Sequence, residues 1–248
     1  MRETIKNKDI VIIPDVHGRP FWREAVKGRE HQRIVFLGDY LDPYGGEGIS
    51  RDSAYREFLD IIDFKKAHMD NVTLLLGNHD MGYLDGIICE DRKDHAREKE
   101  IRDLILRNID LFDMVHVEDV AGAQMLFSHA GVRTTWIRAN MGIIGEAMKD
   151  PCVLNGMLHD AASRDLLYET LANVAYIRGG MHDAGSVVWC DVREFAEMDD
   201  FLPGYIQVFG HTLHDGGPYM VQGKDGAGFC MDCRRAFLID EEGRLNYC

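Results

Sequence analysis

Residues 9–18 read DIVIIPDVHG, an uninterrupted apolar run followed by a carboxylate, an imidazole and a glycine. A short, continuous apolar run is typical of a strand that is buried on both faces. We therefore predict a strand over residues 9–14, with Asp15 and His17 just beyond its carboxyl end. Because these two residues are two apart on an extended segment, both side chains can turn toward one point as the strand ends.

The same pattern recurs four times along the chain. Apolar runs at residues 33–37, 71–76, 124–127 and 205–209 each end in a cluster of glycine and polar residues. Ligands of α/β proteins bind outside the carboxyl ends of the strands, so we expect these clusters to meet. Together with Asp15 and His17, they supply Asp39, Asp42, Asn78, His79, His129 and His211.

Helical patterns separate the first strands. Residues 52–68 and 91–111 each place apolar side chains along one side, as amphipathic helices do, and residues 150–172 also read as helical. Later short runs at residues 186–190, 219–221, 229–232, 236–240 and 244–247 predict a second sheet packed on the first. No segment resembles a linker, so we expect one α/β domain over residues 1–248.

Composition restricts the partners. The chain has 42 acidic and 28 basic residues, a formal charge of −14, which argues against nucleic acid and anionic membranes as partners. A phosphorylated substrate is compatible with this charge if bound cations reverse its sign locally. The polar N-terminal residues and the lack of a long apolar run predict a cytoplasmic protein whose six cysteines are reduced. The sequence does not define the oligomeric state.

The side chains at the strand ends form a donor set for metals. Carboxylate, imidazole and carboxamide groups without a thiolate suit Mn, Zn or Fe. Asp39 has two carboxylate oxygens and can bridge two cations. Two cations roughly 3.5–4 Å apart can clamp a phosphoryl group for in-line attack. His79 follows Asn78 directly and is the natural general acid for the leaving group, and Asp42 can orient it.

Five sequence blocks carry a family resemblance. They are Asp15-Val16-His17-Gly18, Gly38-Asp39-Tyr40-Leu41-Asp42, Gly77-Asn78-His79-Asp80, Ser128-His129-Ala130-Gly131 and Gly210-His211-Thr212. In this order they resemble the signature blocks of the calcineurin-like metallophosphoesterases, and most closely the phosphoprotein phosphatase branch. The resemblance implies a four-layer β-sandwich, in which two mixed sheets packed face to face are flanked by helices.

The resemblance also implies a ligand set. Asp15, His17 and Asp39 would hold one divalent metal, and Asp39, Asn78, His129 and His211 would hold the second. It assigns the general acid to His79 and its orienter to Asp42. Mn is the favoured metal, with Fe and Zn as alternatives. Leu213 stands where other branches place a second histidine, which favours the phosphatase branch.

One departure concerns the phosphate. Phosphoprotein phosphatases usually carry an arginine after the block that ends at Asp42, but this chain has Pro43. Arg178 is the first candidate to replace that arginine, with Arg193 and Arg133 as weaker ones. Asp191 belongs to a Trp-x-Asp element that resembles one near the family's active site. The alternatives are that Arg178 pairs with a nearby carboxylate and that Asp191 is a turn residue.

The sequence thus predicts a metal-dependent phosphatase. It would hydrolyse a phosphate monoester, on a phosphoprotein or a small metabolite, through attack by a metal-bridging hydroxide with a histidine general acid. An alternative is a phosphodiesterase or dinucleoside polyphosphate hydrolase with the same centre, because a diester carries less charge to clamp. A non-catalytic metal-binding scaffold is a third alternative, which loss of ligands would have indicated.

Overall fold

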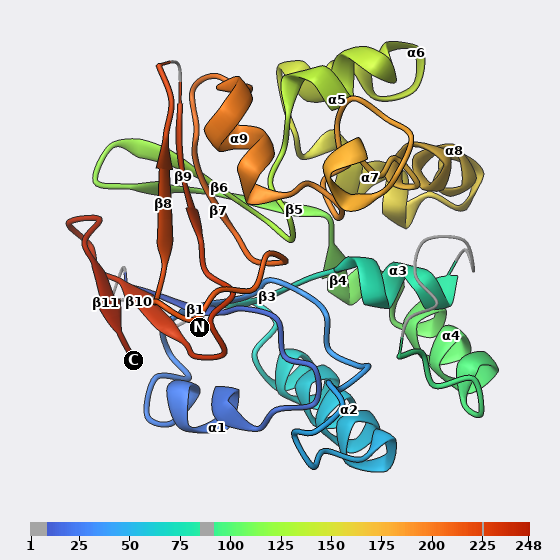
Figure 1. Cartoon of the computed structure of the whole chain (residues 1–248). Coiled ribbons are helices and arrows are strands. Elements are labelled where there is room, and N and C mark those ends of the chain that lie inside the picture. The colour runs from blue at the N-terminus through green and yellow to red at the C-terminus, as the bar shows by residue number, and fades with distance from the viewer. Residues whose placement is uncertain (1–8, 85–91, 225) are drawn as a thin grey trace.

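Two mixed β-sheets packed face to face form the centre of the computed structural model, which describes residues 9–84, 92–224 and 226–248 (Figure 1). The first sheet has the order β11-β10-β1-β2-β3-β4 and the second β5-β6-β7-β9-β8. The strands of the first sheet are β1 (Ile10–Ile13), β2 (Arg33–Phe36), β3 (Val72–Leu75), β4 (Phe112–Asp113), β10 (Phe237–Ile239) and β11 (Leu245–Tyr247). Those of the second are β5 (Val115–Val120), β6 (Ala123–Ser128), β7 (Ile206–Phe209), β8 (Tyr219–Gln222) and β9 (Ala227–Cys230).

Parallel pairing brings the predicted strand ends to one side of each sheet. Strands β1, β2, β3 and β4 are parallel to one another, whereas β10 and β11 are added antiparallel beside β1. In the second sheet, β6, β7 and β9 are parallel, and β5 and β8 run antiparallel at its edges. The carboxyl ends of β1, β2, β3, β6 and β7 therefore hold the five clusters.

Alternate residues of the apolar strands pack into different layers. Ile10 and Ile12 of β1 lie between the two sheets with Phe127 and Val208, whereas Val11 and Ile13 face the helices. All four residues of β1 are buried, which explains why its sequence is continuously apolar rather than alternating.

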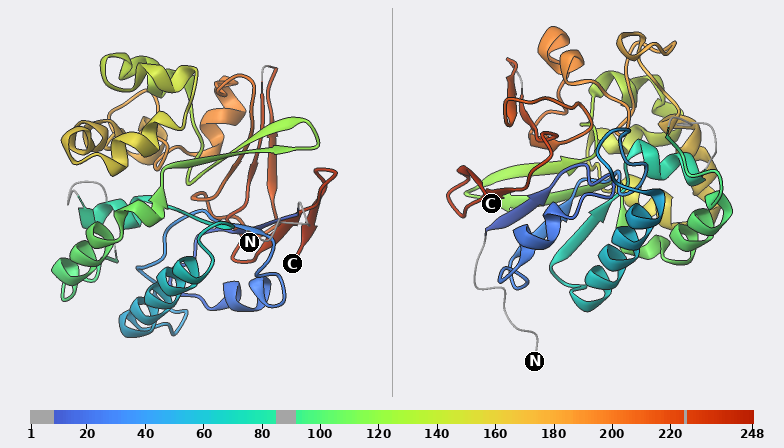
Figure 2. Two further views of the ribbon diagram at one scale, coloured as in Figure 1. Left: turned by 180° about the vertical axis from the view of Figure 1, so that it is seen from behind. Right: turned by 60° about the horizontal axis from the view of Figure 1, so that its bottom comes forward.

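Helices complete the outer layers (Figures 1 and 2). The first sheet is covered by α1 (Phe21–Val26), α2 (Arg51–Ala67) and α4 (Glu98–Arg107), and α3 (Asn78–Leu84) follows β3 directly. Helices α5 (Thr134–Ala139), α6 (Met141–Ile144), α7 (Val153–His159) and α8 (Ala161–Leu171) group together, and α9 (Val192–Met198) lies on the second sheet. Short 3-10 turns occur at Ile109–Leu111, Gly145–Met148 and Tyr176–Arg178.

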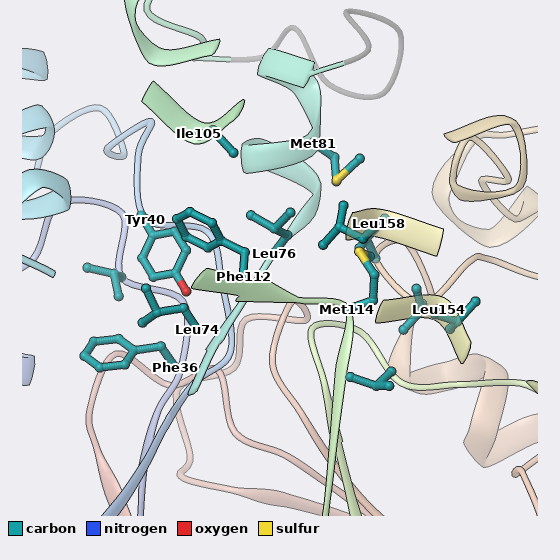
Figure 3. Packing of buried hydrophobic residues seen from close by; sticks show 14 of the residues in the cluster. Phe36, Tyr40, Leu74, Leu76, Met81, Ile105, Phe112, Met114, Leu154 and Leu158 are labelled. Carbon is teal, nitrogen blue, oxygen red and sulfur yellow. The ribbon is translucent and has the colours of Figure 1, made fainter. Parts of the chain in front are cut away.

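The helix-side core joins these layers. Tyr40 stacks on Phe58 with ring centroids 5.2 Å apart, and Phe112 of β4 lies 6.1 Å from both rings. Figure 3 shows Tyr40 and Phe112 beside Leu74 and Leu76, with Leu154 and Leu158 of α7 on the other side of the cluster. The Tyr40 hydroxyl donates to the Leu75 carbonyl at 2.8 Å, so its polar end is satisfied although the residue is buried.

The four-layer α/β prediction is confirmed, with local corrections. Residues 186–190 form a turn rather than a strand, in which Trp189 and Cys190 donate to the Ser186 carbonyl. The run is apolar because Val187 and Val188 are core residues, and composition alone does not separate a buried turn from a buried strand. The strand predicted at 229–232 is observed two residues earlier in the chain, as β9 at Ala227–Cys230.

Further differences from the prediction concern helix boundaries and sheet membership. Residues 150–172 form two helices, broken at Asp160, whose side chain caps α8. Helix α4 begins only at Glu98, whereas residue 91 of the predicted helix lies outside the described residues. Strands β10 and β11 join the first sheet rather than the second, and β5 was not predicted. Within the described ranges, no helix combines the length and apolarity needed to cross a membrane.

Candidate metal centre

Five strand ends from two sheets meet at one place. Asp15 and His17 follow β1, Asp39 follows β2, Asn78 follows β3, and the second sheet supplies His129 and His211 after β6 and β7. Backbone hydrogen bonds tie the loops together. His17 donates to the Asp39 carbonyl at 2.7 Å, and Gly210 donates to the His129 carbonyl at 2.7 Å. The six predicted ligands thus lie on strand ends that are fixed to one another.

Asp39 lies at the middle of the cluster. Its Oδ2 is 3.5 Å from Nε2 of His17 and 3.7 Å from Nε2 of His129. It is also the member shared by two potential metal-binding groups, His17–Asp39–His79 and Asp39–His129–His211, whose donor atoms lie within 4.8 Å of one another. One carboxylate therefore faces imidazoles on both sides, as a bridging ligand would.

The two central imidazoles have a defined tautomer. Nδ1 of His17 donates to the Leu41 carbonyl at 2.8 Å, and Nδ1 of His129 donates to the Leu37 carbonyl at 2.8 Å. A carbonyl can only accept, so each Nδ1 carries the proton and each Nε2 directs its lone pair into the cluster. Backbone carbonyls that orient histidines in this way are typical of metal sites.

The contacts of His129 fit a cation. Its Nε2 lies 3.0 Å from Oδ1 of Asn78 and 3.1 Å from Nδ1 of His211. Nε2 of His129 and Oδ1 of Asn78 are both acceptors, so they repel each other unless a cation lies between them. A cation bound to both atoms would remove this repulsion. Adjacent ligands that each lie about 2.1 Å from a metal are themselves about 3 Å apart, as these atoms are. The donor set therefore fits divalent metal.

Two glycines allow ligand and backbone to approach closely. A Cβ on Gly77 would lie 2.2 Å from Oδ1 of Asp39 and 2.8 Å from Cε1 of His129. A Cβ on Gly210 would lie 2.1 Å from Oδ1 of Asp15, which accepts from the His211 amide at 3.0 Å. These distances are too short for any side chain, so the glycines in both blocks are required by the ligands beside them.

The loop backbone is strained where the polar side chains point inward. His17, Asp39, Asp42 and His211 have φ angles of 45°, 53°, 59° and 67°, a region that side chains with a Cβ rarely adopt. Strain of this kind clusters at functional sites, where surrounding contacts enforce it. Here Asp80 supplies contacts, because its carboxylate accepts from the amides of Asp39, Tyr40 and Gly77 at 2.7, 3.1 and 2.8 Å.

Burial and charge set the protonation states. Burial alone would raise the pKa of Asp39, but the neighbouring His129, His79 and His17 lower it to about 2. Burial lowers the pKa of His17 to about 3. The carboxylate is thus ionised and the imidazole neutral near pH 7, which are the forms that bind metal.

His79 and Asp42 form a pair beside the cluster. Nδ1 of His79 lies 2.8 Å from Oδ2 of Asp42, whose other oxygen accepts from the Tyr83 hydroxyl. Nε2 of His79 lies 2.8 Å from Nη2 of Arg92. The sequence did not single out Arg92, because residues 91–111 read as one charged helix face. The structure instead places Arg92 in a loop before α4, with its own φ at 63°.

The residues predicted to bind the phosphate gather around the carboxylate of Asp191. Arg178 Nη2 donates to Thr212 Oγ1 at 2.8 Å, and its Nε is 3.1 Å from Oδ2 of Asp191. Arg193 pairs with the same carboxylate at 2.8 and 3.0 Å. Asp191 also caps α9 through a capping box with Glu194. Arg178 therefore lies next to the His211 block but pairs with a carboxylate, and Asp191 has a structural role.

Arg133 is buried and shares Glu194 with the capping box of α9. Its side chain is 1% exposed and pairs with Glu194 and with Asp200. It joins α5 to α9 and to the loop after α9.

Asp232 is a buried carboxyl that no sequence pattern points to. It follows β9 and is 2% exposed. Burial, together with the charge of Asp15, raises its pKa to about 9. Asp232 belongs to no sequence motif of the site, because the pairing of β9 with β7 is what brings it there.

Comparisons with known proteins agree with this geometry. The model of the calcineurin-like phosphoesterase family matches residues 8–215. The chain belongs to the calcineurin-like phosphoesterases, a family of metal-dependent phosphoesterases, and the resemblance inferred from the five blocks is confirmed. A search of curated proteins found no match.

Two solved structures share the fold. One is a cold-active protein-tyrosine phosphatase of a psychrophilic Shewanella species, with a TM-score of 0.56 and 14% identity, covering 97% of this chain and 80% of that one. The other is a protein serine/threonine phosphatase from Saccharomyces cerevisiae, with a TM-score of 0.52 and 14% identity, covering 94% of this chain and 73% of that one. At these identities the likeness concerns the fold alone.

Proposed function

We propose that this phosphoesterase is a phosphomonoesterase with a dinuclear metal centre. The observation that carries the proposal is the position of Asp39 Oδ2 between His17 Nε2 and His129 Nε2, at 3.5 and 3.7 Å. A carboxylate between two imidazole lone pairs that point into the cluster is the arrangement that two cations sharing one ligand require.

The ligands divide between the two positions. Asp15, His17 and Asp39 would hold one cation, and Asp39, Asn78, His129 and His211 would hold the other. When bound, two divalent cations supply Lewis-acid stabilisation of the phosphoryl oxygens and activation of water. Mn²⁺ is the metal we propose, and Fe or Zn suits the same nitrogen and oxygen donors.

His79 would protonate the leaving oxygen. Oδ2 of Asp42 lies 2.8 Å from Nδ1 of the His79 ring. This contact directs Nε2 of His79 toward the space beside the proposed ligands. The rings of His79 and His17 lie edge to face, with centroids 5.0 Å apart, so the acid sits next to the first metal position. In this structure Nε2 accepts from Arg92 Nη2, so His79 must release that contact and take up a proton at Nε2 before it can serve as the acid for a group bound there.

The substrate we propose is a phosphate monoester on a protein or a small metabolite. The names of the two similar structures, a protein-tyrosine phosphatase and a protein serine/threonine phosphatase, support this class. Leu213 also lies where a second histidine would stand in other branches of the family. A diester or a dinucleoside polyphosphate is the competing substrate class.

A substrate panel with a ligand variant tests the proposal. The Mn²⁺-loaded protein should hydrolyse phenyl phosphate faster than bis(4-nitrophenyl) phosphate or a dinucleoside polyphosphate. Asp39→Asn should abolish this activity and reduce bound Mn²⁺ below two per chain. Asp103→Asn, a partly exposed carboxylate on α4, is the control and should behave like the wild type. Faster diester hydrolysis would favour the competing class, and full activity of Asp39→Asn would refute the bridging role.

A further inference from the structure

Tyr44 lies at the centre of a group of arginines beside the candidate metal centre. Its ring packs edge to face on His17, with centroids 4.9 Å apart. The guanidinium carbons of Arg92, Arg19 and Arg234 lie 3.7, 5.3 and 5.7 Å from the centroid of the Tyr44 ring. Three cations therefore gather around an aromatic ring that touches a proposed metal ligand, although the chain as a whole is acidic.

Two of these arginines are engaged by one carboxylate. Arg19 makes two hydrogen bonds to Glu47, Nε to Oε2 and Nη2 to Oε1, each at 2.9 Å. Arg234 Nε lies 3.5 Å from Oε1 of the same residue. This geometry occupies the fork of Arg19 and lowers the pKa of Glu47. Both guanidinium groups thus serve to hold the loop that follows Asp42.

Arg92 makes a different set of contacts. Its Nη1 donates to the Asp42 carbonyl at 2.8 Å, and its Nη2 contacts Nε2 of His79 at 2.8 Å. These two contacts tie Arg92 to the loop of Asp42 and to the ring of His79. His79 Nε2 is also the atom that would face the leaving oxygen of a substrate, so Nη2 of Arg92 lies beside the position of the reacting phosphoryl group.

We propose that Arg92 binds the phosphoryl group, in place of the arginine that the family carries at the position of Pro43. This inference rests on the proposed function. A charged phosphoryl oxygen is a stronger acceptor than a neutral imidazole nitrogen, so an arriving substrate draws Nη2 from His79 to itself. The stacked Tyr44 ring and the Asp42 carbonyl keep the guanidinium plane in place during this exchange. Arg92 comes from the loop before α4 rather than from the loop of Asp42, but its guanidinium would reach the same phosphoryl group.

The geometry also bears on substrate class. A monoester presents three terminal oxygens, so a guanidinium can bind oxygen atoms that the cations leave uncovered. A diester has two, so it would leave fewer oxygens for the guanidinium. A charge-assisted hydrogen bond from Nη2 adds both energy and orientation. Arg92 therefore favours monoesters over diesters.

Binding of inorganic phosphate to the Mn²⁺-loaded protein tests the inference without turnover. We expect Arg92→Ala to weaken phosphate binding by about tenfold or more, as measured by titration calorimetry, while Mn²⁺ affinity stays unchanged. Arg92→Lys keeps the charge but not the fork, so it should recover only part of the affinity. Arg102→Ala removes the same charge from an exposed position on α4 and should match the wild type.

Hydrolysis supplies the second readout. The ratio of kcat/KM for phenyl phosphate to that for bis(4-nitrophenyl) phosphate should fall in Arg92→Ala, because only the monoester loses a contact. Unchanged phosphate affinity in Arg92→Ala and Arg92→Lys, with full Mn²⁺ loading, would overturn the inference. So would a lower kcat without weaker phosphate binding, since Arg92 would then act through His79.

The two proposals fail in different ways. A wild-type protein that binds phosphate through Arg92 but hydrolyses no monoester would refute the proposed function and leave the phosphate site intact. Monoester hydrolysis that is insensitive to Arg92 would support the function and refute the site. Circular dichroism of each variant confirms that a loss of binding does not come from unfolding.

Discussion

Nδ1 of His79 lies 2.8 Å from Oδ2 of Asp42, although 37 residues separate the two in sequence. Both side chains are nearly inaccessible to solvent, and the second oxygen of Asp42 accepts from the Tyr83 hydroxyl. The pair is therefore held by groups from the loop after β2 and from α3. Its geometry fixes which ring nitrogen of His79 faces the metal positions.

His79→Asn should lower kcat by about 10²–10⁴-fold for phenyl phosphate, because the leaving phenolate then departs without a proton. The loss should be smaller for 4-nitrophenyl phosphate, whose leaving group is a weaker base. Steady-state kinetics on both esters measures the difference. His95→Asn changes an exposed histidine and is the control. An equal loss on both substrates would contradict the acid role.

Asp42→Asn should have a smaller effect on the same reaction. The amide removes the charge that orients and stabilises the ring but leaves His79 itself, so we expect kcat to fall by about 10–100-fold. KM should change little. A full wild-type kcat would show that the Arg92 contact positions His79 without the charge of Asp42.

Gly77→Ala should disrupt the metal centre directly. The new Cβ would lie 2.2 Å from Oδ1 of Asp39, so the carboxylate must move. We expect Mn²⁺ affinity to fall by about tenfold or more and the free energy of unfolding to drop by about 1–3 kcal/mol. Gly156→Ala in α7 meets no atom within 4 Å and should be neutral or stabilising by up to about 1 kcal/mol. Calorimetry measures the Mn²⁺ affinity of each variant, and urea denaturation measures its free energy of unfolding. Similar changes in Gly77→Ala and Gly156→Ala would refute the steric argument.

Asp232 should make the metal-free protein less stable as pH rises. Its folded pKa of about 9 lies above the ordinary value of 3.8, so the folded state keeps a proton that the unfolded state has lost. Stability contributed by this group is present below pH 4 and is lost progressively up to about pH 9. Asp232→Asn should therefore raise the Tm at pH 8 but not at pH 4. Equal shifts at both pH values would contradict the assignment.

Arg133→Ala should destabilise the protein rather than weaken phosphate binding. The variant removes the positive charge that pairs with the buried carboxylates of Glu194 and Asp200. We expect this loss to lower the free energy of unfolding by about 3–5 kcal/mol. Arg138→Ala, on the exposed side of α5, should change stability by less than about 0.5 kcal/mol. Urea denaturation measures the stability, and phosphate titration should leave both variants like the wild type. Weaker phosphate binding in Arg133→Ala alone would place it at the substrate after all.

Much of the fold could be predicted because its strongest signals are local. Strands β1, β2 and β3 are buried on both faces, so their sequences are continuously apolar, and the polar residues after them mark the strand ends. Sheet membership is not local in this way. The sequence at 236–240 predicts a strand, but only the antiparallel pairing of Ile12 with Phe237 assigns it to the first sheet.

The candidate site divides along the same line. The proposed ligands occur in blocks whose glycines and polar residues are adjacent in sequence, so the blocks could be recognised without coordinates. Arg92 and Asp232 have no such block. Their place depends on how one loop folds back onto Asp42 and how β9 pairs with β7, and these are tertiary contacts that no short pattern encodes.

The order β11-β10-β1 has a consequence for biosynthesis. All the proposed metal ligands are outside the ribosome once His211 has emerged, yet β1 then still has an open edge, because its partner β10 follows later in the chain. The contacts of Phe237 and Ile239 between the sheets are also missing at that stage. A nascent chain thus carries all its ligands before it can hold them in place, and its exposed edge is prone to pairing with other chains until residue 239 has emerged.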